Sequence, residues 1–386
     1  MPWKESDVRS ERIRFVVEAL SGEETLSSLC RRYGISRPTG YKWLRRYREV
    51  GSLSELAEHS RRPHRSPRRT PEWMEDRVEA IRRRHGWAGR KISRLLRDEG
   101  IHLARSTVDR ILKRRGLIEP SESQRAAPHR FERPRPNDLW QMDFKGPYPL
   151  SRGGSCHPLS ILDDHSRYAV GLYALESSDG PSVRQCLLKT WELYGLPQAL
   201  LMDHGSPWWA SSNGHGLTRL SVFLIDQGID LIYGAIGHPQ TQGKVERFHR
   251  TLDQALRHQG VPTSRTGFRR RLADWRHEYN DLRPHEALED ETPQTRYRAS
   301  RKSYNPKPRP WEYPEGSDLR RVYGAGLIHY QGNPYFVCHA LNGQLVRCQR
   351  FENRLLVTYR HMQIREICLE GGRTTAVVRP KKWKNV

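Results

Sequence analysis

Near the N-terminus, hydrophobic and polar positions alternate with helical spacing. A first segment carries apolar residues three and four positions apart, which is typical of one face of a helix: Ile13, Val16, Val17 and Leu20. Thr25 can cap a short second helix. The stretch YGIS, residues 33–36, then supplies a glycine for a tight turn and a serine N-cap for a basic third helix, RPTGYKWLRRY. This order predicts a helix-turn-helix unit.

The third of these helices has one face directed away from Leu44 and Tyr47. On that face lie the residues that we expect to contact DNA: Arg37, Thr39, Lys42 and Arg46. A three-helix interaction module is the alternative, and the basic character of the helix favours DNA.

A similar pattern returns in residues 71–117, after a Pro-, Ser- and Arg-rich stretch at 59–70 that reads as a basic linker or a solvated spacer. Ser106 can cap STVDRILKRRG, a helix with Val108 and Ile111 on its inner face. The remaining basic residues are the candidates for contacts with DNA: Arg105, Arg110, Lys113 and Arg114. We therefore predict two all-α helix-turn-helix domains, at 1–58 and 71–117, followed by a proline-rich linker at 118–137.

The pattern changes to strands in the central region. Short apolar runs in LWQMDFKG, HPLSILDD, RYAVGLYAL, QALLMDHG and IDLIYG alternate with helical segments near 181–194 and 217–227. A last helix begins near Gly243, and its apolar residues share one face: Val245, Phe248, Leu252, Ala255 and Leu256. The order predicts a mixed α/β sheet, within a core domain that extends through helical sequence to about residue 300.

Residues 301–386 read as a basic linker followed by short strands. GLIHYQGNPYFV predicts a hairpin about Gly332 and Asn333, and QLVRCQR, RLLVTYR and QIREICL follow it. Many short strands with β-branched and aromatic residues indicate a small β-barrel. Because this part is basic, we expect a DNA-contacting barrel, and a purely structural barrel is the alternative.

Charge separates the ends of the chain from its centre. The net charge is +23 overall, divided as +14 over residues 1–136, −2 over 137–258 and +11 over 259–386. Two basic ends favour a nucleic acid partner over a membrane surface. No apolar run is long enough to span a bilayer.

Six cysteines without a C-x-x-C pair fit a reducing cytoplasm. A zinc site is a weaker alternative, built from Cys338, His339, Cys348, His361 and Cys368.

Three carboxylates stand at transitions between elements of the central region. Asp143 lies in the first strand, Asp203 ends the buried strand QALLMD, and Glu246 lies in the helix after HPQTQG. Three acids in a small volume repel one another unless protons or cations lie between them. Oxygen ligands suit Mg²⁺ or Mn²⁺, and two such ions could support an in-line displacement at phosphorus.

The motifs WQMDFKG, LMDHG and GHPQTQGKVERFHRTL closely resemble the three acidic motifs of insertion-sequence transposases with a retroviral-integrase-type core, the DDE group. YNDLRPHEAL resembles the segment that follows that core, so the resemblance covers about residues 135–300. It implies a ribonuclease-H-like fold with Asp143, Asp203 and Glu246 as the catalytic, metal-binding triad. The family commonly has Asn after the second Asp, where this chain has His204.

The resemblance also implies a function. We expect a DNA transposase that binds the terminal inverted repeats of its mobile element and cleaves at the ends. It would then join the 3′-hydroxyls to target DNA by transesterification, with two Mg²⁺ ions per site and Mn²⁺ as a substitute. The partners would be double-stranded transposon ends, target DNA and further copies of the chain on paired ends, with no membrane and a nucleoid-associated place in the cytoplasm. Three basic residues near Glu246 would contact phosphates: Lys244, Arg247 and Arg250.

Several alternatives remain open. Asp163 and Asp164 could be mistaken for a metal pair, but a turn with pairing to arginine is the better interpretation. His204 could contact DNA or have an ordinary role in a loop. A DNA-binding protein without catalysis and a metal nuclease that cuts without joining are the rival functions.

Overall fold

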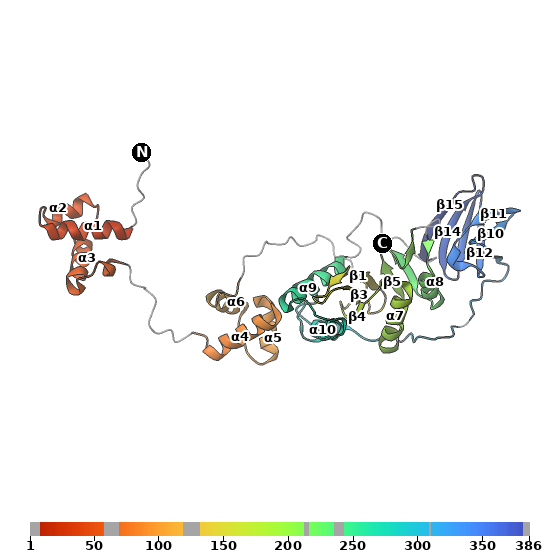
Figure 1. Ribbon diagram of the computed structural model, residues 1–386, viewed down its shortest axis with the longest axis horizontal. Coiled ribbons are helices and arrows are strands. Elements are labelled where there is room, and N and C mark those ends of the chain that lie inside the picture. The colour runs from red at the N-terminus through yellow and green to blue at the C-terminus, as the bar shows by residue number, and fades with distance from the viewer. Residues whose placement is uncertain are drawn as a thin grey trace. The chain divides into compact units, whose positions relative to one another are not determined.

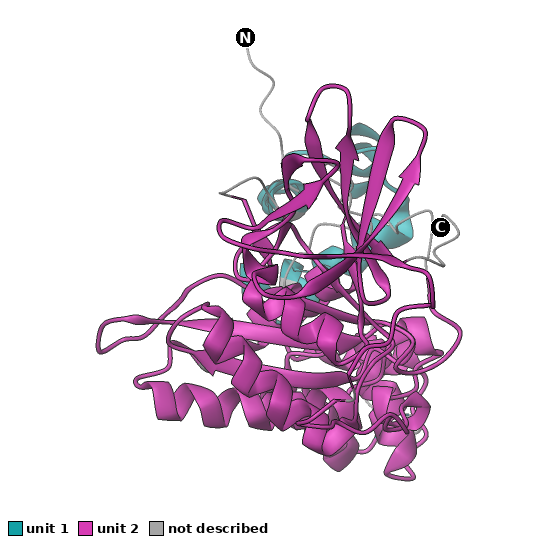
Figure 2. Ribbon diagram, turned by 90° about the vertical axis from the view of Figure 1, so that its right-hand side faces the viewer, with its two compact units in different colours: residues 1–70 teal, residues 71–386 magenta. Residues whose placement is uncertain are grey.

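The computed structural model describes residues 8–57, 69–118, 132–211, 216–234, 243–308 and 310–380. It divides the chain into two compact units, Met1–Thr70 and Pro71–Val386, which Figure 2 colours separately. In the described ranges, no helix is both long and apolar enough to cross a membrane.

The first unit is a three-helix bundle with its own core. Thr25 and Ser36 accept hydrogen bonds from the backbone at the starts of the second and third helices, as the sequence predicts. Phe15, Leu29 and Trp43 are buried between the helices. The elements are α1 (Val8–Ser21), α2 (Leu26–Arg32), α3 (Arg37–Val50) and the 3₁₀ helix η1 (Leu53–Leu56) (Figure 1).

The second unit begins with another helical bundle. Its core includes Val78, Ile92 and Ile111, one from each helix. Ser106, predicted as the cap of the third helix, lies inside it instead, and Ala104 occupies the N-cap position without a side-chain hydrogen bond. The helices are α4 (Glu72–His85), α5 (Gly89–Asp98) and α6 (Arg105–Arg114).

A mixed sheet follows, in the order β2-β3-β1-β5-β8, with β4 paired to β3. β1 is antiparallel to β3 and parallel to β5, and β5 is parallel to β8. The mixed α/β core predicted from the sequence is therefore present. Its main strands are β1 (Trp140–Phe144), β3 (Ser155–Asp163), β4 (Ala169–Leu175), β5 (Ala199–Met202) and β8 (Asp230–Tyr233). The short strand β2 (Tyr148–Pro149) lies at one edge of this sheet, and β6 (Trp209–Ala210) and β7 (Gly216–Leu217) form a separate two-stranded sheet.

Helices pack against this sheet on two sides, because two separate hydrophobic clusters contain its side chains. Val183 and Trp191 of α7 join one cluster with Trp140 of β1, whereas Phe248 of α9 and Phe268 of α10 join the other. The helical elements are α7 (Gly180–Tyr194), α8 (Arg219–Asp226), α9 (Gly243–Gln259), α10 (Arg265–His277), the π-helix η3 (Glu278–Leu282), the 3₁₀ helix η4 (Glu286–Leu288) and α11 (Pro293–Arg296).

The C-terminal strands form a five-stranded antiparallel sheet in the order β15-β14-β13-β12-β9, beside a separate hairpin β10-β11. The predicted barrel is not confirmed, since no pairing among the described strands joins the edges β15 and β9. The hairpin turn lies at Gln331 and Gly332, both with positive φ, one residue earlier than predicted. The elements are β9 (Asp318–Arg321), β10 (Leu327–Tyr330), β11 (Asn333–Phe336), the 3₁₀ helix η5 (His339–Leu341), β12 (Leu345–Phe351), β13 (Arg354–Tyr359), β14 (Met362–Cys368) and β15 (Thr374–Pro380).

This sheet shares one hydrophobic core with the mixed sheet. Val322, Ile328 and Val357 belong to the same buried cluster as Leu224 and Ile229 of the central region. The C-terminal strands therefore cover one side of the core and are not a separately packed module.

Candidate functional site

Asp143 lies near the end of β1, paired across the sheet with Ser160 of β3. Its side chain is 21% exposed. Burial and then the negative charges of Asp203 and Glu246 raise the pKa of Asp143 to about 7, against a hydrogen bond from the Phe144 backbone. The three predicted acids are therefore close enough to interact electrostatically.

Asp203 follows directly after β5 and is oriented by its own loop. The backbone N–H of Gly205 donates to Oδ1 of Asp203 over 2.9 Å, and the indole Nε1–H of Trp208 donates to the same oxygen. Trp208 is buried and stacks on Phe144, with ring centroids 5.5 Å apart. The residue after Asp143 and the loop after Asp203 are thus packed together.

Glu246 lies in the first turn of α9 and is exposed. The opposite face of the helix is buried as predicted, by Val245, Phe248 and Leu252. Most of the HPQTQG loop that precedes the helix lies outside the described residues.

A divalent cation is the ligand that this donor set suits. The three side chains offer only carboxylate oxygens, and burial, together with the negative charges of Asp203 and Glu246, raises the pKa of Asp143. Within the described ranges, no group of three His, Cys, Asp or Glu side chains is arranged so that it could hold a metal ion as it stands. The donor chemistry fits a cation, and the roles of the three residues remain a proposal.

The sequence interpretation missed a histidine beside Asp143. His249 of α9 lies with Nε2 2.9 Å from Oγ of Ser160 and Nδ1 3.8 Å from Oδ2 of Asp143. Burial, and then the charge of Lys145, lower the pKa of His249 to about 4, so the ring is neutral near pH 7. Its place one turn after Glu246 was the available signal, because residues three apart share a helix face. For Trp208, the only signal in the sequence was that it lies five residues after Asp203.

Asp163 and Asp164 are structural residues. Asp163 accepts hydrogen bonds from the backbone of Asn137 and from Ser166. Asp164 is fully buried, and its Oδ1 lies 2.6 Å from Nζ of Lys244. The ammonium of Lys244 is thereby directed into the protein, and its side chain is 16% exposed. The expectation that Lys244 contacts a phosphate is not supported by this arrangement.

The other candidates near the triad differ in exposure. Arg247 and Arg250 lie exposed on α9. His204 is packed between Trp209 and Tyr233, with ring centroids 4.7 and 5.4 Å away, and burial lowers its pKa. His204 therefore packs among the aromatic side chains of this loop.

In the first unit, α3 presents the predicted residues unequally. Arg37 and Lys42 are exposed, whereas the hydroxyl of Thr39 is hydrogen-bonded to the hydroxyl of Ser36. Arg46 donates to the carbonyl of Ala57 over 3.2 Å and lies 5.1 Å from the Trp43 ring, so it also holds the bundle together.

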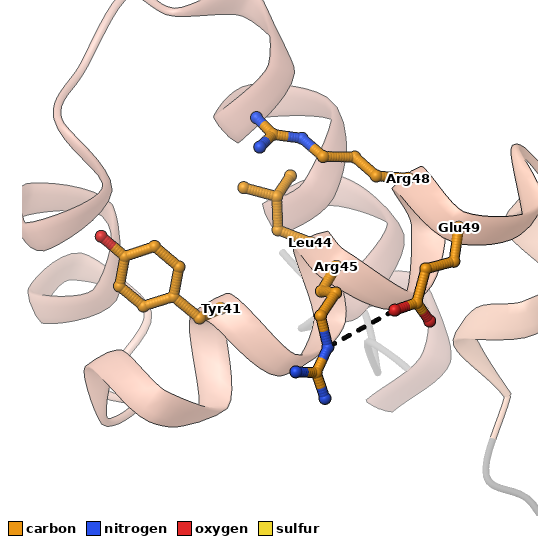
Figure 3. Close-up of a pocket in the computed structure, with 5 residues that line it drawn as sticks. All are labelled: Tyr41, Leu44, Arg45, Arg48 and Glu49. Carbon is orange, nitrogen blue, oxygen red and sulfur yellow. Dashed lines mark ion pairs between the residues drawn. The ribbon is translucent and has the colours of Figure 1, made fainter.

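The exposed side of α3 contains residues that the sequence interpretation omitted. A shallow hollow there is lined by Tyr41, Leu44, Arg45, Arg48 and Glu49 (Figure 3). Arg45 is 77% exposed and pairs loosely with Glu49 over 3.7 Å. Tyr41 and Arg45 therefore join Arg37 and Lys42 as residues that a partner could reach.

In α6, Lys113 and Arg110 are exposed, and Arg105 pairs with Asp109 over 3.4 Å. Arg114 instead donates to Glu75, a carboxylate that is 1% exposed. Removing Arg114 would leave that buried charge with less compensation, so Arg114 has a structural role within the bundle.

The alternative zinc site does not form among the described residues, since no metal-holding group includes its members. His361 lies 3.2 Å from the carbonyl of Ile229 and 3.3 Å from Asp230, which accounts for its position.

Comparison with protein families matches the central region. The model described as Integrase core domain matches residues 133–239, and a second model of the same description matches 227–293. A Homeodomain-like domain matches residues 39–112, and a Helix-turn-helix domain matches 11–64.

Curated relatives are mobile-element proteins. The transposase for transposon Tn552 of Staphylococcus aureus is 24% identical over 64% of this chain and 56% of its own length. The insertion element IS407 uncharacterized 31.7 kDa protein of Burkholderia multivorans is 26% identical over 54% of this chain and 73% of its own length. The chain thus spans about half the length of the Tn552 protein.

Solved structures that the chain matches include the HTLV-2 integrase catalytic core domain in complex with magnesium, at 15% identity and a TM-score of 0.33, covering 42% of this chain and 97% of that one. A simian T-cell lymphotropic virus intasome in complex with PP2A regulatory subunit B56 gamma is matched at 14% identity and a TM-score of 0.40, covering 79% of this chain and 96% of that one. The chain therefore matches Integrase core domain models over residues 133–239 and 227–293, and it is similar to transposases and insertion-element proteins.

Proposed function

We propose that this protein is a DNA transposase that cleaves at the terminal inverted repeats of its mobile element and joins the 3′-hydroxyls to target DNA. The observation that carries the proposal is the electrostatic coupling of Asp143 to Asp203 and Glu246, three acids from a strand, a strand end and a helix. A fold gains little from holding such charges together, whereas two-metal phosphoryl transfer uses a cation site of this composition.

The side chains around these acids would keep them in place. Trp208 and Gly205 fix the carboxylate of Asp203, and His249 with Ser160 borders that of Asp143. The carboxyl group of Asp143 would hold a proton in part of the molecules at neutral pH and release it when a cation binds. Two Mg²⁺ ions, or Mn²⁺ in their place, would activate the attacking oxygen and stabilise the leaving oxygen.

DNA would be bound by the helical units. Arg37, Lys42 and Arg45 on α3 are exposed, as are Arg110 and Lys113 on α6. The first unit would read the terminal repeats and the basic C-terminal sheet would contact DNA less specifically. Joining two ends in one reaction needs more than one copy of the chain, so a homo-oligomer would form on paired ends, at the nucleoid.

The test uses the full chain and a labelled duplex taken from the DNA that flanks its gene, with a scrambled duplex as the control. We expect binding to the flanking duplex over the scrambled one, cleavage at the repeat end, and joined product when Mg²⁺ is present. EDTA should abolish cleavage and joining while leaving most of the binding intact.

Each other outcome selects a rival function. Cleavage without joined product would identify a metal nuclease, and selective binding without any cleavage would identify a DNA-binding repressor. Joining that continues in thoroughly chelated buffer would contradict the metal mechanism.

A further inference from the structure

The first turn of α9 is tied to the strand that carries Asp143. The backbone N–H of Val245 donates to the side-chain oxygen of Gln141 over 3.3 Å, and the buried Gln141 lies two positions before Asp143 in β1. Side chains two positions apart on a strand point to the same face of the sheet. The helix therefore begins over the face of the sheet that carries Asp143.

Ser160 lies on the same face, because it is directly opposite Asp143 in the antiparallel pair of β1 and β3. Its side chain is fully buried. His249 follows Val245 by one turn of α9 and reaches both residues, with Nε2 2.9 Å from Oγ of Ser160 and Nδ1 3.8 Å from Oδ2 of Asp143. The imidazole thus lies between the two side chains, with one ring nitrogen directed to each.

These surroundings select the tautomer of the imidazole ring. A neutral imidazole has one N–H donor, and its other nitrogen is an acceptor. A proton on Nε2 would leave the lone pair of Nδ1 facing the carboxylate of Asp143, which is electrostatically unfavourable. A proton on Nδ1 avoids this repulsion and allows the buried hydroxyl of Ser160 to donate to Nε2. The arrangement therefore favours His249 with its N–H on the side of Asp143.

Lys145, the cation next to this site in the sequence, has a different partner. Its Nζ lies 2.8 Å from Oδ1 of Asp253, which is one turn further along α9 than His249. The ammonium is therefore paired with an acid of the helix. His249, in contrast, has a ring nitrogen that faces Asp143, and its side chain is 12% exposed.

We infer that His249 is a positioning residue, which donates its Nδ1–H to the carboxylate of Asp143 and fixes the orientation of that carboxylate. At 3.8 Å the two atoms lie beyond hydrogen-bond range, and a small rotation of either side chain would complete the contact. Carboxylates that bind metal ions are held by such hydrogen bonds, and removing one typically lowers metal affinity about 10- to 100-fold. The inference rests on the proposed function, because it concerns the cation that Asp143 would bind.

The test compares two amide replacements in the full chain, with Mn²⁺ as the probe. The amide nitrogen of His249→Asn can take the place of Nδ1, whereas the amide group of His249→Gln lies nearer to the place of Nε2. The electron paramagnetic resonance signal of free Mn²⁺ gives the affinity of each protein without DNA. We expect His249→Gln to weaken Mn²⁺ binding about 10- to 100-fold and His249→Asn to bind Mn²⁺ nearly as wild type does.

Two controls define the site. Asp143→Asn shows how much of the Mn²⁺ binding belongs to Asp143. His102→Gln makes the same chemical change at an exposed histidine and should leave Mn²⁺ affinity unchanged. Ser160→Ala tests the tautomer without changing His249. Without the hydroxyl either ring nitrogen can carry the proton, so Mn²⁺ binding should weaken, but less than in His249→Gln.

Melting temperatures without metal separate positioning from folding. A purely structural histidine would lower the melting temperature in both amide variants and leave Mn²⁺ affinity unchanged, which would overturn the inference. An equal loss of Mn²⁺ affinity in His249→Asn and His249→Gln would also overturn it, because the Nδ1 donor would then not matter. If His249→Gln fails to melt cooperatively, unchanged Mn²⁺ affinity in Ser160→Ala would have the same meaning.

The proposed function is judged separately, by cleavage and joining of end DNA by the wild-type chain. It would stand after any of these results if the wild type cleaves and joins with Mn²⁺. A wild type that binds Mn²⁺ but neither cleaves nor joins would overturn the proposed function, and the order of the affinities would still decide the role of His249. Wild-type Mn²⁺ binding no stronger than that of Asp143→Asn would overturn the inference, and the cleavage assay would then decide whether the proposed function falls with it.

Discussion

At the scale of single residues, Asp143 links the fold to the proposed chemistry through its proton. Its pKa rises from the ordinary 3.8 to about 7 in the folded protein. Between these two values the folded protein binds more protons than the unfolded chain, so the free energy of unfolding falls as pH rises through this window. The group thus favours the folded state at low pH and opposes it above pH 7.

Asp143→Asn should remove this dependence. An amide has no charge to bury, so the variant should melt at a higher temperature than wild type at pH 8, with a gain of up to about 4 kcal/mol in unfolding free energy. The two melting curves should converge below about pH 3, where the wild-type carboxyl is protonated in both states. Thermal melts at several pH values check this, and parallel curves across the whole range would mean that Asp143 is not perturbed.

Glu246→Gln tests the acid of the proposed triad that lies on helix α9. The change keeps the helix propensity and leaves Val245 and Phe248 in place. The free energy of unfolding should therefore change by less than about 0.5 kcal/mol, and the melting temperature should change little. Binding to end DNA should persist, whereas cleavage and joining should fall by orders of magnitude. Glu192→Gln, an exposed glutamate on α7, is the matched control and should retain full activity.

Joining by Glu246→Gln at more than about a tenth of the wild-type rate, a barrier change of only about 1.4 kcal/mol, would contradict the triad. Asp164 cannot serve as the control acid, because its buried ion pair with Lys244 makes its removal a change in stability.

The acids could be located from the sequence because each stands at the end or start of an element that its hydrophobic pattern reveals. The residues that contact these acids could not be located in this way. Trp208 reaches Asp203 through a turn whose geometry has no periodic signal, and His249 meets Ser160 across 89 positions of the chain. Lys244 illustrates the same limit, since its partner Asp164 lies on a different element and only the folded chain shows that the ammonium is occupied.

At the scale of the element, α3 shows that a helical pattern predicts the buried face better than the function of the exposed one. Trp43 and Leu44 are buried as their spacing requires. The predicted Arg46, however, returns to the carbonyl of Ala57, while the unpredicted Arg45 is exposed. Long side chains near the edge of a face can fold back onto their own bundle.

We expect Arg45→Ala and Arg46→Ala to separate binding from stability. Arg45→Ala should leave the melting temperature unchanged, because an exposed ion pair contributes little, and should weaken binding to end DNA by about 1–3 kcal/mol if the side chain contacts a base. Arg46→Ala should destabilise the first unit by about 1 kcal/mol through the lost hydrogen bond. Melting and fluorescence anisotropy of the full chain would show the opposite pattern if Arg46 were the residue that contacts DNA.

At the scale of the whole molecule, the C-terminal strands differ from the small independent barrel that their sequence indicates. Strand patterns reveal which side chains are buried but not what covers them. Tyr359 donates to Asp226 over 2.7 Å, Arg360 pairs with the same carboxylate at 2.8 Å, and Cys338 donates to the carbonyl of Leu217. These polar contacts link the C-terminal strands to the central region, in addition to the apolar cluster that the two sheets share.

A chain that ends at residue 308 should therefore lose more than DNA affinity. Without the C-terminal sheet, Leu224 and Ile229 would lose neighbours from their shared apolar cluster, and each large buried aliphatic side chain left uncovered costs about 1.5–3 kcal/mol. Such losses exceed the stability of a typical domain when several occur together. We expect the shortened protein to aggregate or to lack a cooperative melt and near-UV circular dichroism.

Deleting residues 1–70 is the matched control, since that unit has a core of its own and its removal should leave the melting of the remaining protein unchanged. If the chain ending at 308 instead melted cooperatively at the wild-type temperature, the C-terminal sheet would be an independent module after all, and the shared core would contribute nothing to the stability of the mixed α/β sheet.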